Sequence, residues 1–494
     1  MANAFDTPAS GTPFRMAIMG NFRGVREPSA SRHPVAVDKD NLESVLAKMN
    51  VRLHLPNISG SPIELSFREI EDFHPDQLYQ RLEIFDTLRD VRKRIGNPDT
   101  FSAAADQVRA MLGEEEATAP DPGESEPNTA PPKDIDPEDL LNMMMAASDE
   151  SPAPTPRHTS SVPDRSDFKQ FLKKITEGHT VPNVAAEQQH LTDLVDAAIQ
   201  GLMGDILHHP DFQHLEANWR AVKLLVQRLE TDHAIKLYLI DITREELAQD
   251  LAGGVMESHL YQQFVEQSVN TPGAEPWSLL IGAYSFDKNT ADAELLTRIS
   301  QLASFAGAPF LAAAHSRVFG CPQLTDLADP REWQPDTNEE DETAWTTLRS
   351  QPESACLGLL APRFLLRLPY GKGKSETERF AYEEMPTVRH KNFLWGNPAF
   401  LAAYCLGQTF MRQGWGMHPG ALLQIDNLPL AIYEEDGENH AKPCGEYLLS
   451  DRVFEVILDA GVMPVMSVKD RNIVKLGRIQ ALMDPLTQLV GRWQ

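Results

Sequence analysis

Three histidines beside one proline are the residues whose types and spacing most suggest a chemical site. His208, His209 and His214 flank Pro210-Asp211, and clustered imidazoles are common zinc ligands. Their spacing does not fit the H-E-x-x-H pattern of zinc enzymes, and no cysteine or carboxylate lies at the matching helical offset. We therefore expect these side chains to cap and pack the helix that begins at Phe212, and we expect neither a metal nor a cofactor.

A second run contains the glycines and lysines of a phosphate-binding loop. It reads Leu368-Pro369-Tyr370-Gly371-Lys372-Gly373-Lys374-Ser375. A phosphate loop needs a glycine five positions before Gly373, where this chain has Leu368. The helix that should follow is also missing, because residues 376–380 are polar and short. We interpret the run as an exposed basic turn.

Nucleophilic and acid–base catalysis have no specific pattern behind them. The chain has no G-x-S-x-G motif, and its 15 histidines lie near serines by chance. The carboxylate pairs Glu383-Glu384 and Glu434-Glu435 fall in polar runs, which predicts solvated loops. These residues indicate no active site, and we do not expect an enzyme.

Composition excludes two further classes of protein. The 494 residues carry 45 Lys+Arg against 72 Asp+Glu, a formal net charge of -27, which argues against a general nucleic-acid binder. No segment approaches the roughly 18 consecutive apolar residues of a membrane span, so we expect no membrane insertion. Four cysteines without a CxxC pair predict buried thiols in a reducing cytoplasm.

Residues 113–166 differ in composition from the rest of the chain. They contain ten prolines, thirteen acidic and three basic residues, which predicts a disordered acidic linker. Within it, residues 137–147 follow Asp136 as a short capped helix with one apolar face: Leu140, Leu141, Met144 and Met145. Either the apolar content is accidental or the face docks on the protein's own body, or the face binds a partner's groove; the residues alone leave these alternatives open.

The elements on either side predict two modules, 1–112 and 167–494. The first reads as a small α+β unit: a strand at Phe14–Gly20, a hairpin over 51–67, and helices over 76–94 and 101–112. The second alternates helices with buried strands, such as 235–242, 278–286 and 309–314, and 422–432 is a further strand candidate. The expected fold is α/β, with a mixed, largely parallel sheet flanked by helices and the small module packed against it.

Residues 14–112 resemble the small subunit of the type VI secretion contractile sheath (TssB, also VipA). The resemblance rests on the strand into Gly20-Asn21-Phe22-Arg23-Gly24, on residues 35–42, and on Leu65-Ser66-Phe67-Arg68-Glu69-Ile70-Glu71-Asp72-Phe73-His74-Pro75-Asp76. The last run is the most specific.

Residues 190 to about 480 resemble the large sheath subunit (TssC, or VipB). The matching runs are 206–220 (ILHHPDFQHLEANWR) and 361–371 (APRFLLRLPYG), supported by 272–276, 308–314 and 394–399. The second run explains the false phosphate loop. Across both resemblances the family-signature residues are Asp72, Phe73, Pro75, Glu216, Trp219, Arg220, Pro362, Arg363, Arg367, Pro369, Tyr370 and Trp395.

The resemblance implies a natural fusion of both sheath subunits, which fixes their ratio at one to one. Such a sheath polymerises around a secreted tube in the bacterial cytoplasm and contracts to drive it outward. The implied partners are further copies of the chain, the tube protein, the baseplate and a ClpV-type AAA+ ATPase. In the family that ATPase reads a short helix near the start of the large subunit, which favours the 137–147 segment as its recognition site.

Some positions depart from the family pattern. About thirteen residues precede the strand at Phe14, fewer than usual, and residues 475–494 diverge. Asn21, Arg23 and Ala283 replace the usual Asp, Ser and Asp. The alternative hypothesis is therefore a sheath-like adaptor or regulator that caps the sheath or baseplate without polymerising.

Overall fold

The computed structural model describes residues 5–25, 32–58, 61–112, 184–231, 233–322, 329–333, 338–373, 375–435 and 438–493. The predicted linker, with its helix at 137–147, lies outside these residues. The N-terminal part below means residues 5–112 of this set, and the C-terminal part means residues 184–493.

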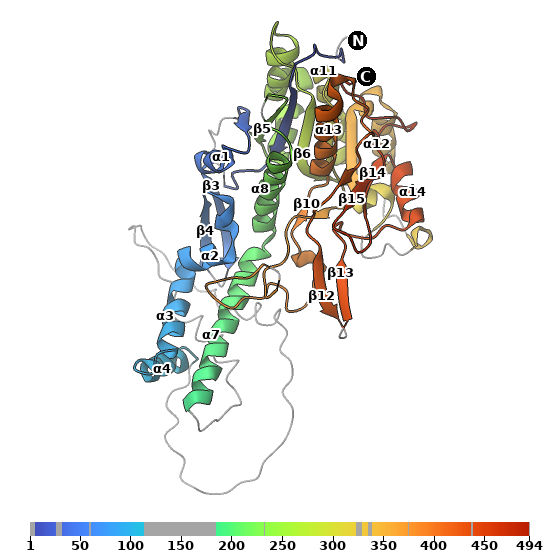
Figure 1. Cartoon of the computed structure of the whole chain (residues 1–494). Coiled ribbons are helices and arrows are strands. Elements are labelled where there is room, and N and C mark those ends of the chain that lie inside the picture. Colours follow the sequence, from blue (N-terminus) through green and yellow to red (C-terminus); the bar gives the residue numbers. More distant parts are fainter. Residues whose placement is uncertain are drawn as a thin grey trace, which may run out of the picture.

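A nine-stranded sheet forms the centre of the molecule (Figure 1). Its interior strands β8, β7, β6, β1 and β5 run parallel, and β14 continues this parallel set; β15, β11 and β2 are antiparallel to their neighbours. The expected largely parallel sheet is confirmed. In spatial order the strands are β11 (Gln424–Ile425), β15 (Val474–Leu476), β14 (Val462–Ser467), β8 (Leu357–Ala361), β7 (Phe310–Ala314), β6 (Leu279–Phe286), β1 (Phe14–Gly20), β5 (Ile235–Asp241) and β2 (Val35–Val37).

Strand β1 comes from the N-terminal part but lies inside the sheet of the C-terminal part. Phe14 to Gly20 pair with Ile235 to Asp241 on one side, and Met16 to Met19 pair with Leu279 to Gly282 on the other. Side chains alternate across a strand, so Met16 and Ile18 enter the core on one face while Ala17 and Met19 enter the core on the other. The apolar run of β1 is thus the signature of a strand buried on both faces.

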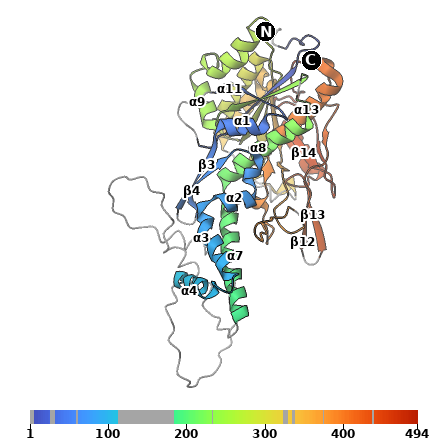
Figure 2. The ribbon, with the colours of Figure 1, turned by 60° about the vertical axis from the view of Figure 1, so that its left-hand side comes forward.

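Helices cover both faces of the sheet (Figures 1 and 2). The core that contains Met19 is closed by α9 (Arg244–Ala252), α11 (Thr290–Ala306), α12 (Glu339–Ser350) and α14 (Asp451–Asp459), with a short α10 (His259–Tyr261) and a π-helix (Gln262–Val269) beside them. The core that contains Ile18 is closed by α8 (Pro210–Arg228) and α13 (Ala399–Gln413). All four cysteines are buried free thiols, as predicted.

The rest of the N-terminal part packs beside α8. It contains α1 (Leu42–Met49), the hairpin β3 (Val51–Ile58) with β4 (Ser61–Phe67), α2 (Pro75–Arg81), α3 (Asp86–Ile95) and α4 (Phe101–Leu112). The predicted single helix over 76–94 is wrong. Leu82 adopts an extended conformation (φ -86°, ψ 125°), and a 3-10 turn at Glu83–Phe85 redirects the chain into α3. This bend places the rings of Tyr79 and Phe85 5.5 Å apart in an edge contact that a straight helix would not allow.

Helix α3 lies along α7 (Val184–Leu207), α4 packs against both near the end of α3, and together the three extend away from the sheet as an arm (Figures 1 and 2). Arg92 of α3 forms a bidentate ion pair with Asp196 of α7. Gln188 of α7 donates to the Ile95 carbonyl at the end of α3, over 2.7 Å. The arm is therefore built from both parts of the chain.

The strand candidate at 422–432 divides in two. β11 ends at Ile425, Asn427 takes a left-handed conformation (φ 56°), and β12 (Ala431–Glu435) leaves the sheet to pair with β13 (Glu438–Lys442). Alternation of apolar residues does not reveal such a break, because it reports burial and not direction. The β12–β13 hairpin projects on the same side of the molecule as the arm (Figure 1). A further short ladder joins β9 (Phe364–Leu365) to β10 (Trp395–Gly396).

Because β1 completes the sheet, a cavity in it should destabilise the C-terminal part. Ile18 is fully buried, and Ile18→Ala should lower the free energy of unfolding by about 2–5 kcal/mol. All seven tryptophans lie at residue 219 or beyond, so tryptophan fluorescence in a urea titration follows the unfolding of the C-terminal part. Val25→Ala, at a side chain that is 50% exposed, is the control. An unchanged fluorescence midpoint for Ile18→Ala would contradict the shared sheet.

Candidate interface site: a buried ion-pair network

The network is built on α8, whose start is fixed by local sequence. The His209 ring accepts the Asp211 N–H at 3.3 Å, and Pro210 occupies the first helical turn, where its missing N–H costs nothing. This confirms the capping role expected for one of the three histidines. From that start, Glu216 and Trp219 fall on the buried face of the helix, both with no exposed surface.

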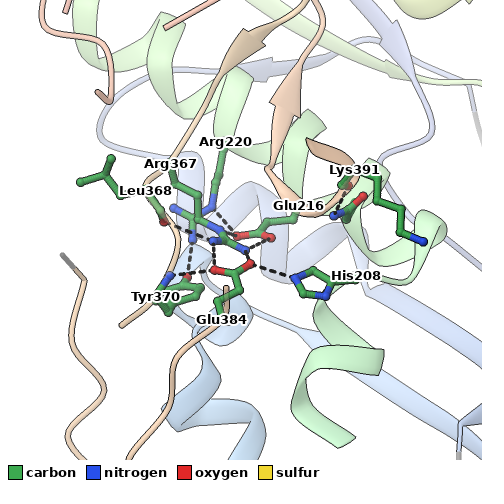
Figure 3. Close-up of polar contacts among 9 residues, drawn as sticks. His208, Glu216, Arg220, Arg367, Leu368, Tyr370, Glu384 and Lys391 are labelled. Carbon is green, nitrogen blue, oxygen red and sulfur yellow. Dashed lines mark hydrogen bonds and ion pairs between the residues drawn. The ribbon is translucent and has the colours of Figure 1, made fainter. Parts of the chain in front are cut away.

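Arg367 lies at the centre of the network (Figure 3). Its Nε is 2.8 Å from Glu216 Oε1, and its Nη1 and Nη2 are 2.7 and 3.0 Å from the two carboxylate oxygens of Glu384. Arg220 adds a 2.6 Å bond to Glu216 and a 3.1 Å bond to the Tyr370 hydroxyl. Two guanidinium groups thus face two carboxylates, so the buried charges balance.

The pKa values in the network follow from this pairing. Burial by itself would raise the pKa of Glu384, but the charge of Arg367, the His208 ring 3.5 Å away, and hydrogen bonds from Arg367 and the Tyr370 N–H lower it to about 2. Burial would lower the pKa of Arg367, yet Glu216 and Glu384 raise it well above its ordinary value. Burial raises the pKa of Tyr370 to about 12. Glu384 and Arg367 therefore keep their charges, and Tyr370 stays neutral, over the whole physiological pH range.

The N-terminal part closes over this network. The His74 ring meets the edge of Tyr370 with centroids 4.8 Å apart. Asp76, at the start of α2, accepts the backbone N–H groups of Glu378 and Arg379 at 2.9 and 3.0 Å. These contacts hold the segment that leads to Glu384 against α2. The network is therefore a junction between segments far apart in sequence.

The signature residues of the N-terminal part support the same junction. The Asp72 carboxylate accepts the Arg68 N–H at 2.6 Å and pairs with Arg81. Phe73 stacks on Phe67 at 4.0 Å and meets Phe212 of α8 edge-on at 5.7 Å. Pro75 occupies the first turn of α2. Phe73 thus makes the contact with α8, while Asp72 and Pro75 hold the turns on either side of it.

Trp219 joins α8 to the loop after β1. Its indole N–H donates to the Phe22 carbonyl at 2.9 Å, and the two rings meet edge-on at 5.7 Å. Asp241, at the end of β5, accepts the Phe22 N–H at 2.8 Å. The two departures in this loop, Asn21 and Arg23, are also held: Asn21 accepts the Gly24 N–H and Arg23 pairs with Asp241 at 3.5 Å.

The remaining signature residues form a separate cluster. Arg363 binds Glu446 at 2.5 and 3.0 Å, and Glu446 also contacts His390. Trp395 donates to the His390 carbonyl at 3.0 Å. Pro362 follows a cis peptide bond, and both it and Pro369 are buried. The family resemblance named these residues in one set with those of the Arg367 network, and it gave no sign that they form two clusters.

Two interpretations of the sequence are wrong here. The run 368–375 is not simply an exposed basic turn, since Tyr370 and Gly371 are buried, while Lys372 and Gly373 are exposed. Glu384 is not solvated but 4% exposed and paired with Arg367. The alternation of apolar residues offered a signal: Phe380 and Tyr382 lie four and two residues before Glu384, and both are buried with it. His74, Asp76 and Glu446 were also missed, because their partners are remote in sequence.

Comparison with known proteins agrees with this architecture. The VipB family model, described as "EvpB/VC_A0108, tail sheath N-terminal domain", matches residues 189–481, more than half of the chain. The chain belongs to the VipB tail sheath family. A second model, "Type VI secretion system, VipA, VC_A0107 or Hcp2", matches residues 8–116. The protein is thus a fusion of a VipA-like and a VipB-like part, and the Arg367 network lies where the two meet.

A curated relative supports the same family. The type VI secretion system sheath protein TssC1 of Pseudomonas aeruginosa is 30% identical over 302 residues, which cover 59% of this chain and 60% of TssC1. The chain therefore spans about 60% of the length of that relative.

Other features of the VipB-like fusion concern metals, membranes and the linker. The described residues contain no cluster of histidine, cysteine and carboxylate side chains suited to a metal ion. Among the helices in the described ranges, none is long and apolar enough to cross a bilayer. Leu140, Leu141, Met144 and Met145 lie outside the described residues, so the proposed recognition helix stays a prediction.

Removing one charge from the network should be costly. Glu384→Gln leaves Arg367 with one carboxylate in a buried site, and such a loss lowers the free energy of unfolding by about 3–5 kcal/mol. The neighbouring Glu383→Gln is the matched control, because Glu383 accepts the exposed Lys372 N–H at 3.2 Å and a surface contact contributes at most about 1 kcal/mol. Urea unfolding measures the change in the free energy of unfolding for each of the two variants. Equal effects of the two substitutions would contradict the assigned role of Glu384.

Substitution of Asp205, in the last turn of α7, should raise the free energy of unfolding, unlike substitution of Glu384. Burial raises the pKa of Asp205 from 3.8 to about 6, although the charge of His208 lowers it. A carboxyl with a raised folded-state pKa favours the folded state below pH 4, and this contribution is lost as the pH rises through 6. Asp205→Asn should therefore stabilise the protein by roughly 1–2 kcal/mol at pH 7.5, with a smaller gain at pH 4.5. The exposed Asp193→Asn is the control; a pH-independent gain would rule out this explanation.

Proposed function

We propose that this protein is a structural subunit of a type VI secretion contractile sheath. In this role it assembles around a secreted tube and contracts to drive protein translocation. The observation that carries the proposal is the presence of both sheath families in one chain, with β1 of the VipA-like part paired between β5 and β6 of the VipB-like part. The proposed sheath role itself requires no bond chemistry.

The mechanism proposed is mechanical. In this mechanism the VipA-like and VipB-like parts move as one body, which the shared sheet and the Arg367 network support. Contraction is then a change in packing between such bodies, biased by a small free-energy difference per subunit and summed along the polymer. A fused chain supplies both parts in equal number at a high effective concentration.

The proposed partners follow from the family. They are further copies of the chain, an inner tube protein, a baseplate and a ClpV-type AAA+ ATPase, all in the bacterial cytoplasm. The apolar face of residues 137–147 is proposed as the segment that the ATPase recognises, on its sequence alone.

Negative-stain electron microscopy of the purified full-length chain, with and without a type VI tube protein, tests the proposal. A sheath subunit should form long hollow tubes, and sedimentation should show polymer that increases with protein concentration. Monodisperse particles that persist at high concentration and beside tube protein would overturn it. They would instead support the non-polymerising adaptor that caps a sheath or baseplate.

A further inference from the structure

A cluster of polar and aromatic side chains at the base of the β12–β13 hairpin has a geometry that ion pairing alone does not explain. Its centre is His390, whose ring lies between Trp395 and Tyr447, with centroids 5.1 and 4.8 Å away and interplanar angles of 28° and 25°. Lys442, the last residue of β13, and the buried Glu446 approach opposite nitrogens of this ring. The imidazole is thus held in one plane with a defined partner at each end.

Glu446 decides which imidazole nitrogen carries the proton. It is 2% exposed and accepts two bonds from Arg363. Burial would raise its pKa, but His390 and Arg363 lower it to about 2, so it is ionised and can only accept hydrogen bonds. His390 Nε2, 3.0 Å from Glu446 Oε1, must therefore be the donor. The Tyr447 hydroxyl, 3.1 Å from the same nitrogen, is compatible with that tautomer.

The Nε2–H tautomer leaves a lone pair on Nδ1 of His390, and the amine of Lys442 lies 3.3 Å from it. Lys442 is half-buried, and burial lowers its pKa although the charge of Glu446 opposes this. The rings of Phe393, Trp395 and Tyr447 surround its amine at 5.7–5.9 Å. A lysine in this setting is neutral more often than an exposed one.

Nucleophile, base and orienting carboxylate form a chain of contacts here, as in enzymes that activate a nucleophile through histidine. We propose that Lys442 is a reactive lysine that accepts acyl groups from acyl thioesters, with His390 as the base and Glu446 as the residue that positions it. The ring cluster also holds the ammonium form by cation–π contacts, so charge and reactivity compete at one site.

The step balances without a further reactant. The neutral amine of Lys442 attacks the thioester carbonyl carbon, a C–N bond forms, and its proton passes to Nδ1 of His390. The C–S bond then breaks, and the departing thiolate takes the proton from His390. The products are an amide on Lys442 and a free thiol.

Acylation changes how the hairpin is attached. Ala431 and Lys442 pair at its base, and Ala431 is buried beside Phe393 and Trp395. The amide carries no charge, so the cation–π contacts that hold β13 to this cluster are lost. The modification therefore acts on the element that projects from the body beside the arm (Figure 1).

The test uses the full chain and an acetyl thioester, with peptide mass spectrometry to follow each lysine. At pH 7.5 Lys442 should be acetylated at least tenfold faster than Lys469 and Lys372, which are exposed. As the pH is raised, the rate at Lys442 should reach its plateau at a lower pH than the rates at these two lysines. A Lys442 rate equal to or below that of the exposed lysines in the wild-type chain would overturn the proposal.

Two matched variants separate the base from the fold. His390→Phe keeps a ring between Trp395 and Tyr447 but removes Nδ1, and it should reduce the Lys442 rate at least tenfold while Lys469 and Lys372 react as before. His440→Phe changes another hairpin histidine, which stacks on Tyr433, and should leave the rate unchanged. If His390→Phe left Lys442 as reactive as in the wild type, His390 would not be the base. If His390→Phe also changed the acetylation rates of Lys469 and Lys372, the variant would have disturbed the fold. The comparison of the lysines in the wild-type chain, with its pH profile, would then decide the proposal.

Discussion

The pairing of β1 with both β5 and β6 is the constraint on which the rest of the structure depends. Without β1, two parallel strands would face a gap with unpaired N–H and C=O groups, and unpaired buried backbone groups are costly. The strand also sends Met16 and Ile18 to one core and Ala17 and Met19 to the other. One seven-residue segment of the VipA-like part thus completes both layers of the VipB-like part.

The Arg367 network adds orientation to this shared sheet. Buried ion pairs contribute little net stability, because desolvation offsets their attraction, but breaking one is costly. Arg367 meets Glu216 and Glu384 only when α8 and the segment before Glu384 are correctly placed. Asp76 fixes that segment from the VipA-like side. The charges therefore specify one arrangement of the two parts, which suits a subunit whose proposed work is done by rigid-body movement.

The second cluster uses similar residues for a different purpose. Around Arg367 two cations meet two anions and every charge is matched. At the hairpin, Arg363 alone pairs bidentately with Glu446, and His390 and Lys442 extend the chain toward half-buried surface. A lysine that stands at the end of such a chain, among aromatic rings, is held less firmly as a cation. The Arg367 network fixes the body of the protomer, and the cluster around His390 lies where the β12–β13 hairpin joins that body.

The sequence alone determined the class of fold and most of its elements, because apolar periodicity records which residues are buried. It also identified Glu216, Arg220, Arg367 and Tyr370 by family resemblance, but not that they meet. Only the tertiary structure decided that β1 lies between β5 and β6, that Leu82 and Asn427 redirect the chain, and that Glu384 is buried. The place of β1 and the position of the segment before Glu384 depend on contacts between residues hundreds of positions apart, such as Phe14 with Ile235 and Asp76 with Glu378, and local patterns carry no record of them.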